Sequence, residues 1–290
     1  MSGKSTGGSR IAPYLQVAPL ALIMLATVGI PLVTVVLLSF WESDGIAIYP
    51  AFTWANYEQV LTSPTTLRLF VATIKYALIT LIATTLIGFA CAYFLVFHVR
   101  DLRWQIGLFL LCTIPFWTSN VIRMVSWIPF LGREGLFNTL LMQAGLIDAP
   151  LDVLLYSDFA VVLTYIHLFT LFMIVPIFNS MAKINPNLIE AARDAGASGW
   201  QILRDIIIPL SKTGIALGSI FVVTLVMGDF FVVRVMSGGQ SASVVSAMKN
   251  NIDQLYYPQA SAMAVLLVAV VLLMVSAILR VVDIRSELAR

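Results

Sequence analysis

The stretch NPNLIEAARDAGASGWQILRDIIIP, residues 185–209, lies between two long apolar runs and contains residues that typically start and end helices. Asn185 followed by Pro186 is typical of a helix N-cap and first helical position. Gly196 stands where a helix ends in the left-handed conformation. The spacing therefore predicts a short first helix over residues 186–195.

The second half of the stretch predicts another helix. Ser198 and Gln201 form an S-x-x-Q capping box, and Pro209 is expected to break the chain again before the next apolar run. Each helix has an apolar side that can dock. The apolar positions are Leu188, Ile189 and Ala192 in the first helix and Trp200, Leu203 and Ile207 in the second.

The apolar runs on both sides place this stretch in a membrane protein. The 290-residue chain is 60% hydrophobic and only 11% charged, against about 25% for an average soluble domain. A helix needs about 20 apolar residues to cross about 30 Å of hydrocarbon, and six segments qualify. They are residues 14–40, 69–97, 106–131, 159–181, 213–235 and 260–282. The first far exceeds a signal-peptide apolar region, so we expect an uncleaved span.

The distribution of basic residues orients these spans, because cytoplasmic loops carry an excess of Lys and Arg. With the N-terminus inside, the cytoplasmic residues are Lys4, Arg10, Arg100, Arg103, Lys183, Arg193, Arg204, Lys212, Arg280, Arg285 and Arg290. The external ones are Arg68, Arg133 and Lys249. We expect both termini in the cytoplasm, with a tail over residues 1–13, a membrane domain over 14–282 and a tail over 283–290.

Two external segments have character of their own. Residues 135–147 are apolar at helical spacing but too short to span, which predicts a short helix at the outer membrane face. Residues 41–67 have strand or coil character and carry aromatic side chains suited to the water–lipid interface. They either anchor the loop there or dock an external partner.

Several function classes are excluded by composition and motif. A formal charge of +2 leaves no basic field for nucleic acid, and Gly3-Lys4-Ser5 lacks the rest of a phosphate-binding loop. Cys91 and Cys112 lie inside apolar runs, and we interpret them as small hydrophobic residues rather than metal ligands or a disulfide. A protease pair of His167 with Ser219 or Ser276 is weaker than a role in packing between helices. We expect no catalytic residue and no metal site.

The spacing in the 185–209 stretch resembles the signature of the permease subunits of binding-protein-dependent ABC importers. That signature is E-A-A, three residues, Gly, nine residues, then I-x-L-P. The matching residues are Glu190, Ala191, Ala192, Gly196, Ile206 and Pro209, with Ile208 in place of the Leu. The patterns at residues 179–181 and 229–231 look most like the spermidine/putrescine-type permeases.

The resemblance implies an all-α, type I permease fold with six transmembrane helices, in a bacterial inner membrane. It makes residues 183–212 a coupling loop that seats a short helix in a groove of a cytoplasmic ATPase. It also implies a second homologous permease, two ATPase subunits that hold ATP and Mg, an external solute-binding protein and surrounding lipid. This chain itself is expected to bind no cofactor. The alternative is an amphipathic connector lying on lipid headgroups.

Ionisable residues inside membrane spans indicate a functional role, because placing a charge in the hydrocarbon core costs free energy. Lys75 can instead snorkel to the outer interface. Arg123 lies in a segment interrupted by Pro115 and Pro129, where it either lines a pathway or pairs with Asp229. The full set of pathway candidates is Trp117, Asn120, Arg123, Trp127, Asp229, Phe230 and Arg234.

The solute class stays open at this point. The resemblance implies an ammonium group held by Asp229, Trp117 and Phe230, as for a polyamine-like solute. Arg123 and Arg234 together outweigh Asp229 and favour an anionic or zwitterionic solute. A stand-alone secondary transporter is a further alternative, although the chain shows no internal repeat.

Overall fold

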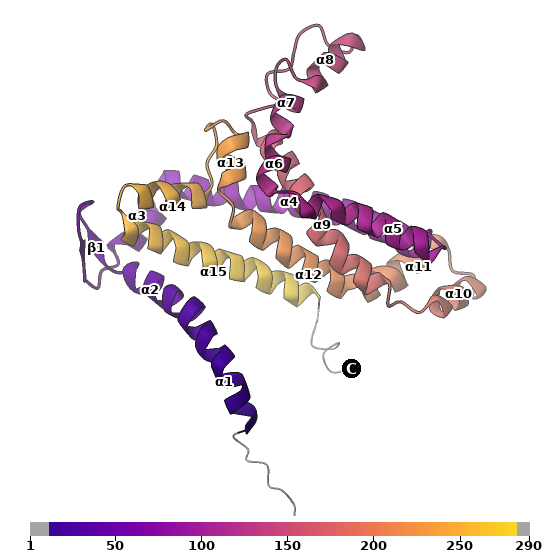
Figure 1. Cartoon of the computed structure of the whole chain (residues 1–290), viewed down its shortest axis with the longest axis horizontal. Helices are drawn as coiled ribbons and strands as arrows, with labels where there is room; N and C mark the ends of the chain where they lie inside the picture. Colours follow the sequence, from indigo (N-terminus) through magenta and orange to yellow (C-terminus); the bar gives the residue numbers. More distant parts are fainter. Residues whose placement is uncertain (1–11, 283–290) are drawn as a thin grey trace, which may run out of the picture. The chain divides into compact units, whose positions relative to one another are not determined.

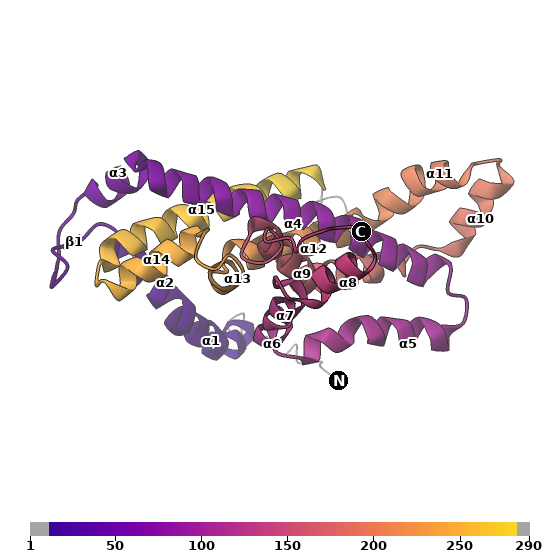
Figure 2. The same cartoon turned by 90° about the horizontal axis from the view of Figure 1, so that it is seen from above.

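The computed structural model describes residues 12–282 and is mostly helical over that range, which confirms the all-α prediction (Figures 1 and 2). The tail expected over residues 283–290 and nearly all of the one over 1–13 lie outside the described residues. Within the described residues, five helices are long and apolar enough to cross a membrane, or six if one bent pair is a single span. The chain divides into two compact units.

The first unit, residues 1–62 with 248–266, begins with the first expected span. Its helical pieces are α1 (Ala12–Met24), the π-helical turn η1 (Leu25–Gly29) and α2 (Ile30–Leu38). Pro31 lacks the N–H that an α-helix uses, and the wider π turn directly before it lets the helix continue.

A small hairpin follows in the same unit. Strands β1 (Glu42–Ser43) and β2 (Ile48–Tyr49) pair antiparallel around Gly45, whose φ of +84° is left-handed. Backbone N–H groups of Ala47 and Ile46 donate to Asp44 Oδ1 and lower the pKa of that carboxyl group. The turn is therefore held by local hydrogen bonds.

The rest of the segment 41–67 is more helical than expected, because it contains α3 (Ala55–Thr62). The buried Asn56 side chain fixes this helix by donating to the carbonyl oxygens of Ser39 and Trp41, at 2.9 and 2.8 Å. A cluster of aromatic rings packs beside it. Its members are Phe40, Phe52, Trp54 and Tyr57.

The second unit, residues 63–247 with 267–290, is built on three long helices that lie side by side (Figures 1 and 2). They are α4 (Pro64–Phe97), α9 (Asp158–Met181) and α12 (Ile208–Met227). A Cβ atom on Gly88 would lie 2.7 Å from Met173 Cγ, and one on Gly218 would lie 2.6 Å from Met173 Sδ. Small residues thus let α4 and α12 approach α9 closely, as is common in membrane bundles.

The expected third span, residues 106–131, is not one straight helix. The pieces are α5 (Leu102–Thr113), the 3-10 turn η2 (Ile114–Trp117), α6 (Asn120–Val125), α7 (Trp127–Leu131) and α8 (Leu136–Gln143). The helical direction changes by 93° at Thr118 and Ser119, just after the turn that contains Pro115. The interruption was predicted, and α8 is the short helix expected over residues 135–147.

The expected fifth span, residues 213–235, has the wrong boundaries. Helix is continuous from Gly199 to Met227 through α11 (Gly199–Ile202), the π turn η3 (Leu203–Ile207) and α12, then stops, and α13 (Phe231–Met236) follows. Pro209 does not end the helix. Proline has no N–H to donate to the preceding turn, and the π turn before it accommodates the lost hydrogen bond, as at Pro31.

The remaining helices agree with the sequence prediction more closely. The second span begins at Pro64 rather than residue 69, and α9 begins one residue earlier than expected. The last expected span, residues 260–282, is α15 (Tyr257–Val281), preceded by α14 (Val244–Asp253).

Candidate functional site

The stretch at residues 185–209 forms two capped helices joined by a tight turn. The Asn185 side chain accepts a hydrogen bond from Asn187 N at the start of α10 (Pro186–Asp194), as predicted. The chain turns at Gly196, where φ is +83°, and Ala197 N donates back to Ala192 O at 2.9 Å. A residue with a Cβ atom is strained at such a φ.

The second helix is closed by the predicted capping box. The Ser198 side chain accepts from Gln201 N, and the Gln201 side chain accepts from Ser198 N at 2.7 Å. Each helix of the stretch therefore begins with a side-chain cap that satisfies a free backbone N–H group, which favours a stiff pair.

The apolar residues of the two helices differ in their exposure. Leu188 and Trp200 are exposed, at 49% and 68% of their surface, whereas Ile207 is buried. Among the signature residues, Glu190, Ala191 and Gly196 are exposed and Ile206 is half-buried. Most of α10 is thus exposed, while Ile202 and Ile207, which lead into α12, are buried.

The broken third segment carries the first group of pathway candidates. Trp117 is 87% exposed at the end of η2, whereas Arg123 on α6 is only 8% exposed. Arg123 Nη2 donates to Asn120 Oδ1, and its buried Nε has no partner among the described residues. Trp127 Nε1 donates to His167 Nδ1 at 2.9 Å, so His167 binds an indole rather than a serine.

Asp229 lies at the break between α12 and α13. Its Oδ1 accepts from Tyr165 Oη at 3.2 Å and from Val232 N at 2.8 Å, so the carboxylate caps the first turn of α13. The ion pair with Arg123, one of the two interpretations drawn from the sequence, is not among the ion pairs of the described residues. Arg123 Nη2 donates instead to Asn120 on its own helix.

The two remaining candidates around this break lie on α13 or at its start. Phe230 is half-buried and contacts the ring of Phe231 at a centroid distance of 6.2 Å. Arg234 is exposed. These residues and Asp229 do not line the cavity that Trp117 lines.

Lys75 does not snorkel freely, because it pairs with Asp158 at 3.0 Å. The same carboxylate accepts hydrogen bonds from Tyr76 Oη at 2.6 Å and Ser241 Oγ at 2.8 Å. It joins α4, the first turn of α9 and the loop after α13. Sequence reasoning placed Asp158 in an external loop and gave no signal for this junction.

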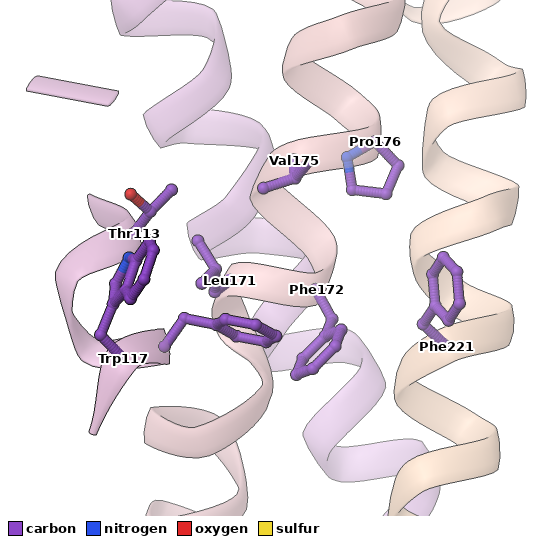
Figure 3. A pocket seen from close by; sticks show the side chains of 8 residues that line it. Thr113, Trp117, Leu171, Phe172, Val175, Pro176 and Phe221 are labelled. Atoms are coloured by element: carbon purple, nitrogen blue, oxygen red, sulfur yellow. The ribbon is translucent and has the colours of Figure 1, made fainter. Parts of the chain in front are cut away.

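Two adjoining cavities run along α9 and α12 and share Val175, Pro176 and Phe221. The first has a volume of about 370 Å³ and is lined mainly by aromatic and aliphatic side chains (Figure 3). The second, about 340 Å³, adds Asn179 and Lys183 toward the C-terminal end of α9.

Of the pathway candidates, only Trp117 lines either cavity. Sequence reasoning missed Phe172 and Phe221. One signal was available: Tyr165, Phe172 and Asn179 follow one another at seven-residue intervals, which places them on one face of α9.

Sequence comparisons connect this arrangement with known transport proteins. The family described as binding-protein-dependent transport system inner membrane component matches residues 85–287. The chain is 33% identical over 208 residues to the spermidine/putrescine transport system permease protein PotB of Escherichia coli (strain K12), an alignment that covers 72% of this chain and 74% of that protein. It is 32% identical over 222 residues to the protein of the same name from Haemophilus influenzae, with 76% of both covered.

A structural comparison supports the same fold. A chain of a bacterial alginate ABC transporter, solved in complex with an alginate pentasaccharide-bound periplasmic protein, superimposes with a TM-score of 0.72. The two chains are 16% identical, and the match covers 92% of each. At that identity the likeness concerns the fold alone.

Proposed function

This chain belongs to the family of binding-protein-dependent transport system inner membrane components, and from that membership we propose that it couples ATP hydrolysis on partner subunits to import of a polyamine-like cation. As a family member it is a multi-pass inner-membrane permease subunit of an ABC importer and not an enzyme. A stand-alone secondary transporter is incompatible with this family.

The coupling role falls to the coupling loop, residues 183–212, and within it to the matched residues. These are Glu190, Ala191, Ala192, Gly196, Ile206 and Pro209. The stiffness of the two capped helices and the exposure of Leu188 and Trp200 support this role, because a helix seated in a partner's groove must present apolar anchors without bending.

The assembly follows from the same role. The chain pairs with a second homologous permease, two cytoplasmic ATPase subunits dock on the inner loops, and a solute-binding protein delivers cargo from outside. ATP and Mg belong to the ATPase subunits. Both termini lie in the cytoplasm, as the distribution of Lys and Arg favours.

The proposed solute is a polyamine-like cation. The observation that carries this choice is the 33% identity to a spermidine/putrescine permease over 208 residues. The anionic or zwitterionic alternative depended on Arg123 and Arg234 facing the solute together. The burial of Arg123 and its bond to Asn120 weaken that alternative.

A competition experiment tests the solute class. The full complex is reconstituted in liposomes that contain ATP, and the binding protein is added outside. Uptake of radiolabelled spermidine is then measured against excess unlabelled putrescine, glutamate or glycine betaine. We expect only the diamine to compete. Inhibition of spermidine uptake by glutamate or glycine betaine, or uptake of labelled glutamate or glycine betaine without spermidine uptake, would contradict the proposed cation.

A further inference from the structure

The aromatic cavity between η2, α9 and α12 has a chemistry that distinguishes between solute classes. Its residues are Thr113, Phe116, Trp117, Leu171, Phe172, Val175, Pro176 and Phe221. Among these residues there is no charged side chain, and Thr113 carries the only hydroxyl group. The volume of about 370 Å³ lies within the range of small-molecule sites, about 300–1,000 Å³.

Four aromatic rings line this space, and three of them form a continuous wall. Phe172 contacts Phe116 edge-on at a centroid distance of 5.6 Å and lies 6.3 Å from Phe221. Trp117 stands on the opposite side from Phe221, with Phe172 between them (Figure 3). An aromatic ring attracts a cation over its face, and the lining of this cavity has no charged group that could bind a carboxylate.

The cavity is also connected to Asp229 through packed rings. Asp229 binds Tyr165 Oη, the Tyr165 ring stacks on Phe169 at 5.6 Å, and Phe169 contacts Phe172 at 6.2 Å. Tyr165 and Phe169 are buried. They therefore hold Phe172 in place rather than touching solute themselves.

The adjoining cavity continues along the same face of α9 and has a different character. It offers the amide of Asn179 and the ammonium of Lys183. A cation leaving the rings in this direction meets polar groups and then a repelling charge, but no carboxylate among the residues that line this cavity. The positive charge of Lys183 repels a cation in this second cavity, so the aromatic cavity is the more favourable of the two for an ammonium ion.

We infer that the aromatic cavity is a transient site for an organic ammonium ion with a methylene chain, with Trp117, Phe172 and Phe221 as its specificity-determining residues. The methylene groups pack against the apolar wall, and the ammonium groups lie over the ring faces. This inference rests on the proposed function and deepens it, because it names the residues of this chain that contact the solute.

The test uses the reconstituted full complex with radiolabelled spermidine. Phe221→Leu keeps an apolar side chain but removes the ring, and Phe221→Trp keeps a ring with a stronger cation attraction. Phe159→Leu is the matched control, because Phe159 is 53% exposed and Phe221 is 50% exposed, but Phe159 lines neither cavity. Trp117→Leu tests the opposite wall at a side chain that is 87% exposed and so contributes little to folding.

We expect Phe221→Leu and Trp117→Leu each to lower ATP-driven uptake about threefold to tenfold, in line with the strength of one cation–π contact. Phe221→Trp and Phe159→Leu should retain the wild-type rate. Equal losses in Phe221→Leu and Phe221→Trp, or no loss in either leucine variant, would overturn the inference while spermidine uptake by the wild type still upholds the proposed function.

Two further results are decisive. If native mass spectrometry shows a phospholipid lost from Phe221→Leu while spermidine uptake is unchanged, the cavity holds lipid and the inference is wrong. If the wild-type complex imports no amine, the proposed function and the inference both fail.

Discussion

Asp229 anchors α13 by accepting hydrogen bonds from Tyr165 Oη and Val232 N. Asp229→Ala leaves both donors without this acceptor, so we expect the free energy of unfolding to fall by about 1–3 kcal/mol. The melting temperature of the purified complex should fall accordingly.

A double-mutant cycle separates this cap from the ion pair that the sequence also allowed. Asp229→Ala combined with Tyr165→Phe should be non-additive by about 0.5–3 kcal/mol, because the two side chains are in contact. Asp229→Ala combined with Arg123→Gln should be additive within about 0.5 kcal/mol. Strong coupling to Arg123 instead would show that the two charges pair in the assembled protein.

The junction at Asp158 predicts unequal effects for its two charged residues, Lys75 and Asp158. The Lys75–Asp158 pair is half exposed, with side-chain exposures of 54% and 45%, so Lys75→Met should cost about 0–1 kcal/mol. Asp158→Ala also releases Tyr76 and Ser241 and should cost more, about 1–3 kcal/mol. Melting temperatures of the two variants give the comparison, and a larger loss in Lys75→Met would contradict it.

At the scale of elements, the turn between α10 and α11 depends on backbone conformation alone. A Cβ atom on Gly196 would meet no neighbour within 4 Å, but its φ of +83° is strained for any side chain. Gly196→Val should therefore cost about 1–2 kcal/mol of local strain and shift α10 relative to α11.

We expect Gly196→Val to retain ATPase activity in the complex while lowering ATP-driven uptake several-fold. Gly199→Ala is the matched control, since Gly199 also has open space around it and its φ is not positive. It should behave as wild type. Uptake that is equal in both variants would argue against a rigid coupling turn.

The sequence predicted this element best because its determinants are local. Asn185, Ser198, Gln201 and Gly196 act within a few residues, and the structure has the expected cap, capping box and left-handed turn. The prediction that Pro209 ends the helix was wrong. A π turn before the proline lets the helix continue, and sequence periodicity does not reveal π turns.

The pathway was less predictable, because its contacts are tertiary. The bonds of Asp229 to Tyr165 and of Trp127 to His167 join residues 64 and 40 positions apart. Hydropathy identifies a charged residue within a span but not its partner. The aromatic cavity likewise depends on how α9 and α12 pack, which the spacing of Phe172 only suggests.

At the scale of the whole molecule, the orientation in the membrane is directly testable. In a background with Cys91 and Cys112 replaced by serine, Ala195→Cys in the exposed turn after α10 should react with an impermeant thiol reagent only from the cytoplasmic side. Asp148→Cys, after α8, should react only from outside. The reverse labelling pattern would contradict the distribution of Lys and Arg as a guide to topology.

The most direct measurement is ATP-driven uptake of radiolabelled spermidine by liposomes that hold this chain with its second permease, ATPase subunits and binding protein. We predict that uptake requires ATP and every partner and falls several-fold in Gly196→Val. Spermidine uptake by this chain alone without ATP, or undiminished coupled uptake in Gly196→Val, would contradict a permease subunit driven through the 185–209 stretch.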